Sequence, residues 1–193
     1  MKYTLFCLLL FGLTYPHSAQ VGLKKYGTHF LQEIIRTSGG GYYALGTRND
    51  TFTVLIKLDS GMNPIWEKQF TGPKGQRSIG YKIYENTDHS VFILGAIYNS
   101  NHYNDLNSWL LKLNSDGEVL WNKTYNNCFD IYALCPDPAG GYFLGGSSNL
   151  RGITIDGVVM KIDNSGNFIS KFNFQYNQRN IVNNWKYFRM GHS

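Results

Sequence analysis

The chain has little charge, little proline and little cysteine, and each shortage excludes a class of protein. Only 16% of its 193 residues are charged and 42% are hydrophobic, which excludes an intrinsically disordered chain. Five prolines and 21 glycines without a Gly-X-Y period exclude a collagen-like fibre. Three cysteines are too few for a dense disulfide framework, so the fold must rest on a hydrophobic core. The length suits one domain or two small ones.

Concentrated positive charge is also missing. The formal net charge of +5 is spread along the chain, whereas a nucleic-acid-binding surface needs a clustered basic patch. We therefore expect no nucleic-acid partner.

Long apolar runs are absent apart from one at the N-terminus. Residues 3–13 are eleven apolar residues after a basic start, too few for a transmembrane helix of roughly 20 residues but enough for the core of a signal peptide. Residues 14–19 then resemble a cleavage region that ends at Ala19. We expect residues 1–19 to be a signal peptide, the protein to be secreted or at the cell surface, and no membrane span. The alternative is a short buried strand or helix.

Export would leave two cysteines, Cys128 and Cys135, on either side of a probable strand. Seven residues of extended chain cover roughly 23 Å, but a disulfide needs Cα atoms within about 7 Å. We expect that the two do not bridge each other. Whether they are free or bonded to other chains stays open, and no metal-ligand spacing accompanies them.

The most informative feature is an internal repeat with a period near fifty residues. Residues 40–46 (GGYYALG) return loosely at residues 90–95 and again at residues 140–145. The predicted closing glycines of the three copies are Gly46, Gly95 and Gly145. This spacing indicates three copies of one structural unit.

A second part of the repeat is centred on a lysine. The segments VLIKLD, WLLKLN and VVMKID place Lys57, Lys112 and Lys161 in apolar surroundings. Nine residues after the lysine come Trp66, Trp121 and, in the third copy, a serine. Aromatic residues follow thirteen residues after the lysine in every copy. Such constant offsets favour a structural repeat.

Each copy has the pattern of four short strands separated by Gly and Asn/Asp turns. In the second copy we expect strands at residues 79–84, 91–96, 108–113 and 119–125. The third strand of each copy is apolar on both faces, so it must be covered on both sides. We predict an all-β fold, an incomplete β-propeller of about three four-stranded antiparallel blades after the signal peptide.

We expect the repeat domain to occupy residues 20–175. Its copies fall at about 28–75, 76–127 and 128–175, and residues 176–193 form a tail or begin a further blade. Complete propellers usually have four to eight blades. An open arc would expose an apolar face at each end, so self-association is expected.

The repeated unit, with GGYxLG, then KLD, then G and W, resembles the blade repeats of secreted bacterial β-propeller proteins. Residues 112–121 are also similar to the tryptophan-docking repeat of pyrroloquinoline-quinone-type propellers. The resemblance covers roughly residues 23–175 and implies a propeller fold. Related quinoprotein dehydrogenases enclose their cofactor with eight blades, which three blades cannot do, so no cofactor is expected.

The repeated side chains allow a functional and a structural interpretation. Trp66 and Trp121 would form an aromatic ledge for a ligand, or would pack between blades. Lys57, Lys112 and Lys161 would surround an anion-binding channel, or their stems would pack between blades. In both cases we favour packing, because a structural repeat places residues periodically without any functional requirement.

The Asn/Asp-rich turns at residues 114–118 and 163–167 faintly resemble calcium loops. They lack a closing bidentate glutamate, so hairpin turns are the favoured interpretation. We expect no metal site.

The insertion at residues 96–108 is the best candidate for a ligand-binding loop. It is rich in amide and aromatic groups, which suit recognition of a carbohydrate or a protein, and the candidates are Tyr98, Asn101, His102, Tyr103 and Asp105. The alternative is a tolerated loop extension without function.

No catalytic motif accompanies these candidates, so we expect a protein that is not an enzyme. The favoured function is an exported, non-catalytic propeller module that binds a protein or glycan through its rim loops. The alternatives are a fragment of a quinoprotein-like or polysaccharide-active propeller enzyme, and a purely structural fragment.

Overall fold

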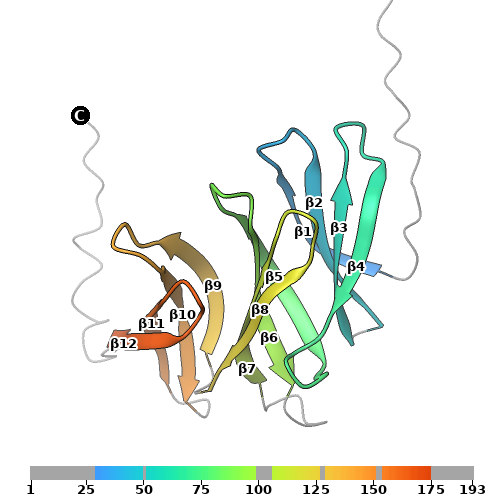
Figure 1. Cartoon of the computed structure of the whole chain (residues 1–193). Coiled ribbons are helices and arrows are strands. Elements are labelled where there is room, and N and C mark those ends of the chain that lie inside the picture. The colour runs from blue at the N-terminus through green and yellow to red at the C-terminus, as the bar shows by residue number, and fades with distance from the viewer. Residues whose placement is uncertain (1–28, 50, 99–105, 127–128, 151–153, 175–193) are drawn as a thin grey trace, which may run out of the picture.

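The protein is built from β-strands that hydrogen-bond in three groups of four (Figure 1). The structure, a computed structural model, describes residues 29–49, 51–98, 106–126, 129–150 and 154–174. No helix in these ranges is long and apolar enough to cross a bilayer.

Each sheet is formed by consecutive strands. The first sheet contains β1 (His29–Arg36), β2 (Tyr42–Arg48), β3 (Phe52–Leu58) and β4 (Pro64–Phe70). The second contains β5 (Ser78–Glu85), β6 (Val91–Tyr98), β7 (Leu106–Leu113) and β8 (Val119–Tyr125). The third contains β9 (Phe129–Pro136), β10 (Tyr142–Leu150), β11 (Thr154–Ile162) and β12 (Phe168–Phe174).

All the strand pairs are antiparallel and each strand pairs with the next in sequence, so every sheet is a simple meander. Strand β5 of the second sheet contacts β1, β2 and β3, and β9 of the third contacts β5, β6 and β7. The sheets therefore stand side by side with the second in the middle (Figure 1). This arrangement confirms the predicted fold class: the protein is an incomplete β-propeller with three four-stranded blades.

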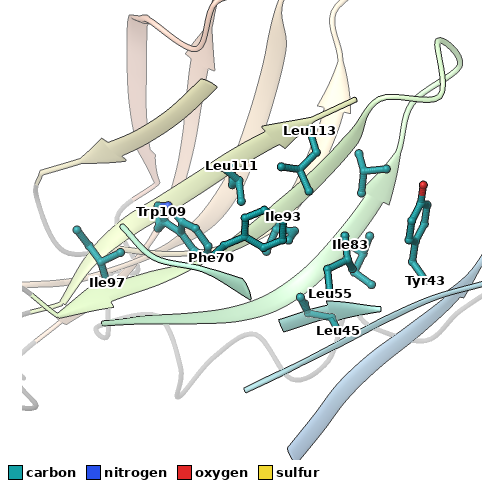
Figure 2. Close-up of a cluster of buried hydrophobic side chains, with 11 residues drawn as sticks. Tyr43, Leu45, Leu55, Phe70, Ile83, Ile93, Ile97, Trp109, Leu111 and Leu113 are labelled. Atoms are coloured by element: carbon teal, nitrogen blue, oxygen red, sulfur yellow. The ribbon is translucent and has the colours of Figure 1, made fainter. Parts of the chain in front are cut away.

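The first and second sheets enclose one hydrophobic cluster between them (Figure 2). Its buried side chains are Tyr43, Leu45, Leu55, Phe70, Ile83, Val91, Ile93, Ile97, Trp109, Leu111 and Leu113. Burial of this apolar surface holds the two sheets together at roughly 25 cal/mol for each Å² removed from water.

A second cluster lies between the second and third sheets. It contains Phe92, Leu94, Leu110, Tyr125, Ile131, Tyr142, Leu144, Val158, Met160 and Ile162. Neighbouring residues of β6, such as Ile93 and Leu94, thus belong to different clusters, because successive side chains of a strand point to opposite faces. This explains why β6 and β7 are almost continuously apolar.

The first sheet has a smaller cluster on the face that points away from the second sheet. Ala44, Val54, Ile56 and Leu58 are buried there and Tyr42 packs against them. Val54 has no exposed surface, so this face is covered and is not open to solvent at its centre.

The prediction of Gly145 as the closing glycine of the third copy is wrong by one residue. Gly46 and Gly95 each lie opposite the third residue before the repeat lysine of their sheets. In the third sheet that position is Val158, and its partner is Gly146. In all three sheets, the turn between the first and second strands is closed by a backbone hydrogen bond to the equivalent residue. The closing glycine of each copy is therefore identified by its distance from this turn, and not by the similarity of the glycine-rich segments.

The hairpin between the third and fourth strands of each sheet has one constant design. Asp59, Asn114 and Asp163 begin these turns, and the Oδ1 atom of each accepts hydrogen bonds from the backbone N–H groups two and four residues later. These side-chain oxygens replace backbone acceptors, as Asn and Asp commonly do in tight turns. The segments that resembled calcium loops are therefore hairpin turns.

Candidate functional site

The three repeat lysines lie over aromatic rings of their own sheets. The distances from Nζ to the ring centroid are 5.8 Å for Lys57 and Tyr43, 5.1 Å for Lys112 and Phe92, and 5.4 Å for Lys161 and Phe143. Distances below about 6 Å permit attraction between the ammonium group and the ring. The lysines therefore take part in the packing of each blade.

Two of these lysines also reach the neighbouring sheet. Lys57 donates to the carbonyl of Ser115 at 2.9 Å, and Lys112 donates to the hydroxyl of Tyr142 at 3.1 Å. Both ammonium groups thus lie between blades, as the packing interpretation requires, and not around an anion channel. Lys161 instead forms an ion pair with Asp137 of its own sheet, at 2.6 Å.

The two tryptophans are contact points between blades. The indole of Trp66 lies against Gly117 of the second sheet, and that of Trp121 lies against Gly166 of the third. Trp121 also donates from Nε1 to the carbonyl of Asn164 at 3.2 Å. A Cβ at Gly117 would come within 2.9 Å of the Trp66 ring. Both tryptophans are thus half-buried against turns of the next blade, which agrees with the packing interpretation.

Of the predicted loop residues, only Tyr98 falls within the part of the chain that the structure describes. Asn101, His102, Tyr103 and Asp105 lie outside the described residues. Tyr98 ends β6, and its backbone N–H donates to the carbonyl of Arg77 at 3.0 Å. The guanidinium carbon of Arg77 lies 4.8 Å from the centroid of the Tyr98 ring, a cation–π distance.

Two tyrosines that no sequence motif singles out lie close to this point. Tyr81 and Tyr132 are left unpaired by bulges in β5 and β9, the first strands of the second and third sheets. Their ring centroids are 6.3 Å apart and their planes are inclined by 33°. Bulges redirect single side chains and are common beside functional sites. Here they bring aromatic side chains of two blades together.

A carboxylate completes this group. Burial raises the pKa of the Tyr132 hydroxyl, and the side chain of Asp130 beside it raises that pKa further. Burial, with the nearby charge of Asp130 and the rings of Tyr98 and Tyr132, raises the pKa of Tyr81 to about 12. Tyr81 and Tyr132 therefore keep their hydroxyl protons at neutral pH. We call Arg77, Tyr81, Tyr98, Asp130 and Tyr132 the tyrosine cluster.

The tyrosine cluster combines three kinds of contact group. Tyr132 is 51% exposed, so its ring offers an apolar surface to solvent beside a polar hydroxyl. Asp130 supplies an acceptor and Arg77 a planar donor. A few polar groups placed around aromatic rings are typical of sites that orient a small ligand.

The cluster does not have the composition of a glycoside hydrolase site. Such sites need two carboxyl groups, one as general acid and one as nucleophile or base, on either side of the scissile bond. Asp130 is the one carboxylate within the cluster as described. The neighbouring Glu33 is engaged elsewhere, because it accepts hydrogen bonds from Lys82 at 2.7 Å and from the backbone N–H of Ile83.

A second candidate lies at the opposite end of the blades. A groove of about 430 Å³ between the first two sheets is lined by residues that include Lys57, Glu85 and His89. Ser38 Oγ lies 3.0 Å from His89 Nδ1, and Glu85 Oε1 lies 3.7 Å from the same nitrogen. A catalytic relay needs the hydroxyl and the carboxylate on opposite ring nitrogens. These three residues therefore do not form one.

The same trio has a structural role. The carboxylate of Glu85 accepts from the backbone N–H of Ser38 at 2.7 Å and from its hydroxyl at 3.1 Å. This contact joins the turn after β1 to the end of β5. Within the described residues, no group of three His, Cys, Asp or Glu side chains is arranged to hold a metal ion.

Comparison with known proteins adds a likeness in fold alone. No protein-family model and no curated protein matches the chain. Among solved structures, it is similar to an α-L-arabinofuranosidase from Clostridium thermocellum, with 13% identity, a TM-score of 0.48 and coverage of 73% of this chain. It is also similar to a protein of unknown function from Bacteroides caccae, with 10% identity, a TM-score of 0.32 and coverage of 76% of this chain.

These likenesses are partial. The chain spans 49% of the arabinofuranosidase and 68% of the Bacteroides caccae protein. At these identities and TM-scores neither neighbour carries an argument about what this chain binds or does. The site must be interpreted from its own residues.

Proposed function

We propose that this protein is an exported, non-catalytic binding module that recognises a glycan at the tyrosine cluster. The observation that carries the proposal is the half-exposed ring of Tyr132, which packs beside Tyr81 and lies next to the carboxylate of Asp130. Export is supported by the signal-like residues 3–13 of the sequence.

The chemistry of a sugar matches the groups in the cluster. One face of a sugar ring carries C–H groups that pack against an aromatic ring, and its hydroxyls need donors and acceptors at the rim. Tyr132 provides the ring, Asp130 accepts from hydroxyls, and Arg77 donates to them. The predicted residues Asn101, His102, Tyr103 and Asp105 follow Tyr98 in the sequence, and we propose that they add further polar contacts.

The position of the cluster also favours recognition over structural use. Tyr81 and Tyr132 lie on β5 and β9, each of which is an edge strand of its sheet. Their rings are held by the rigid packing of two blades, so little conformational entropy would be lost when a ligand binds. Sites that are built on a rigid scaffold gain affinity from this preorganisation.

A glycan array followed by calorimetry would test the proposal. We expect the purified chain to bind a defined set of glycans and Tyr132→Ala to weaken binding by roughly two- to tenfold, since one aromatic contact contributes about 0.5–1.5 kcal/mol. Tyr132→Phe keeps the ring and should lose less. The matched control is Phe168→Ala, which removes an equally exposed ring of β12 and should bind as the wild type does.

Two results would overturn the glycan proposal. One is an array without any binding, together with capture of a protein partner that depends on Tyr132. The other is binding that is equal in the wild type and in Tyr132→Ala. Release of new reducing ends from a bound polysaccharide would replace the non-catalytic assignment with that of a hydrolase.

A further inference from the structure

The second inference concerns the third sheet and does not depend on the glycan proposal. Each sheet has one face that carries its repeat lysine, which we call the lysine face. In the first two sheets the next sheet buries the centre of this face, so Leu55 and Leu110, two residues before the lysine, have no exposed surface. In the third sheet Val159, at the same position, is only half-buried, and Gly157 is exposed. Among the described residues, this third lysine face therefore lacks the cover that the other two have.

On the covered faces, the first strand of the next sheet lies across the first three strands. Strand β5 contacts β1, β2 and β3, and β9 contacts β5, β6 and β7. Ile83 of β5 belongs to the cluster between the first two sheets, and Leu134 of β9 packs against the cluster between the second and third. A strand with one apolar residue directed at the sheet before it thus covers the centre of a lysine face.

The sequence after β12 contains a segment that matches β5. Residues 185–189 read Trp-Lys-Tyr-Phe-Arg, and residues 81–85 of β5 read Tyr-Lys-Ile-Tyr-Glu. Both segments start eleven residues after the aromatic residue at the end of their repeat, which is Phe70 in the first copy and Phe174 in the third. In this match, Tyr187 takes the position of the inward-facing isoleucine of β5.

The chain after β12 is long enough for such a strand. The connection from β4 to β5 uses residues 71–77, and that from β8 to β9 uses only residues 126–128. The first strands have eight residues each. Residues 175–193 can therefore provide a connection of the longer kind followed by a first strand.

The centre of the third lysine face is made of smaller residues than its counterpart in the first sheet. Leu45 and Glu33 pair with each other in the first sheet, and Gly145 and Ala133 occupy their places in the third. The matching segment has Tyr187 where β5 has an isoleucine and β9 a leucine. A larger ring would thus meet smaller side chains, which preserves the close packing of protein interiors.

The charges of the face and the segment are complementary. Register places Asp130 on the third lysine face, where Asp137 and Lys161 already pair with each other at 2.6 Å. The described residues of the face therefore carry an excess of negative charge. Residues 181–189 contain two basic residues and no acidic one, and the first of them is Lys186. At the equivalent position of β5, a lysine forms an ion pair with a carboxylate of the first lysine face.

We propose that residues 181–189 dock on the lysine face of the third sheet as the first strand of a further blade, with Tyr187 directed at Ala133. The docked segment would cover β9, β10 and β11, as β5 covers the first three strands of the first sheet. Strand β12 would stay uncovered, because later strands of the next sheet supply that cover in the inner blades, where Phe70 of β4 clusters with residues of β6 and β7.

The position of Trp185 follows from this docking. It matches Tyr81 and Tyr132, which stand at the bulges of β5 and β9. The rings of these two tyrosines lie side by side, with centroids 6.3 Å apart. Trp185 would therefore stand beside Tyr132 and add a third ring to the tyrosine cluster.

Hydrogen exchange of the full chain, measured by mass spectrometry at several protein concentrations, tests the docking. We expect the amides of residues 181–189 to exchange at least about tenfold more slowly than those of a free peptide of the same sequence. Tyr187→Asp should abolish this protection, because it places a charge within an apolar contact. Phe188→Asp is the matched control and should keep the protection, because successive side chains of a strand point to opposite faces.

Two substitutions at Ala133 test the other side of the contact. This residue is exposed on the edge strand β9, so a larger side chain there leaves the core intact. Ala133→Lys would face Lys186 and should lower the protection of the segment roughly two- to fivefold. Ala133→Glu restores the residue type of Glu33 and should keep or raise the protection, because it offers Lys186 the partner that Lys82 has in the first sheet.

Three results would overturn the docking. One is exchange of residues 181–189 at the rate of the free peptide. Another is protection that rises with protein concentration, which would make a second copy of the chain the occupant of the face. The third is an equal loss in Tyr187→Asp and Phe188→Asp, or equal exchange in the two Ala133 variants. Circular dichroism checks that each variant is folded, and no measurement involves a glycan, so the glycan proposal can fail without affecting this test.

Discussion

In the first and third sheets, one face carries the repeat lysine above an aromatic ring of the same sheet. The surroundings of this face differ between the two sheets. Lys57 reaches the carbonyl of Ser115 in the next blade, whereas Lys161 forms an ion pair with Asp137, in the turn after β9 of its own sheet. The first face is enclosed in a hydrophobic cluster, and the third carries exposed phenylalanines. The equivalent residues Phe70 and Phe174 thus both have an aromatic side chain, although no described residue covers Phe174.

The equivalent residues Phe70 and Phe174 give the largest expected contrast between the two faces. Phe70→Ala should destabilise the monomer by about 3–4 kcal/mol, because it leaves a cavity between the first two sheets. Phe174→Ala should change the stability of the monomer by less than about 0.5 kcal/mol. Urea unfolding at concentrations where the chain is monomeric measures both values. Equal losses would contradict the view that only Phe70 is covered.

A comparison of two glycines at positive φ measures how much the docking of a turn on the neighbouring blade contributes to stability. Gly117 lies against Trp66 and Lys68, whereas a Cβ at Gly75 would meet no atom within 4 Å. Both substitutions to alanine strain the backbone by roughly 1–2 kcal/mol, and Gly117→Ala adds overpacking of about 1–3 kcal/mol. Chemical denaturation should therefore show a clearly larger loss for Gly117→Ala. If Gly75→Ala costs as much, the turn does not dock as tightly as its geometry implies.

A substitution at Met62, in contrast, is expected to raise the stability of the chain. It has a φ of 62° where the equivalent Gly117 and Gly166 have φ of 74° and 75°. Met62→Gly removes the steric cost of this conformation and should stabilise the chain by about 0.5–1 kcal/mol, after the greater entropy of glycine in the unfolded state is counted. A shift of the thermal midpoint upwards checks it, and a downward shift would show that the methionine side chain has a packing role.

The ion pair of the third sheet should give the smallest effect, and only at low pH. The hydrogen bond from Lys161 holds the pKa of Asp137 below its usual value. A lowered carboxyl pKa contributes stability that is present above the ordinary pKa of about 3.9 and is lost as pH falls through the folded value. Thermal midpoints measured from neutral pH to pH 2 should therefore fall less steeply for Asp137→Asn than for the wild type. High salt should reduce the difference.

The sequence was sufficient to predict the blades because their borders depend on local chemistry. The Asn/Asp turns and the lysine-centred strands mark each hairpin, and the predicted strand at residues 119–125 coincides with β8. The error at Gly145 arose where two adjacent glycines, Gly145 and Gly146, fit the pattern equally well. Only the hydrogen-bonded register distinguishes them, and register is a property of the pair of strands.

The candidate site was predictable only in part. Tyr98 was found because it lies in the insertion at residues 96–108, which is longer than its counterpart in the first copy. Tyr81 and Tyr132 were missed, since their orientation depends on bulges that interrupt the two-residue alternation of a strand. The presence of a tyrosine at the same point of two first strands was visible in the sequence. That these rings meet across two blades depends on how the sheets pack.

The second sheet has consequences for how the chain acquires its structure during synthesis. Both of its faces are apolar and each belongs to a different cluster, so it cannot be soluble by itself. When its last strand leaves the ribosome, the first sheet is available to cover one of its faces. The other face stays exposed to solvent until about fifty further residues have been translated. In this interval the nascent protein is most open to aggregation and most in need of a chaperone.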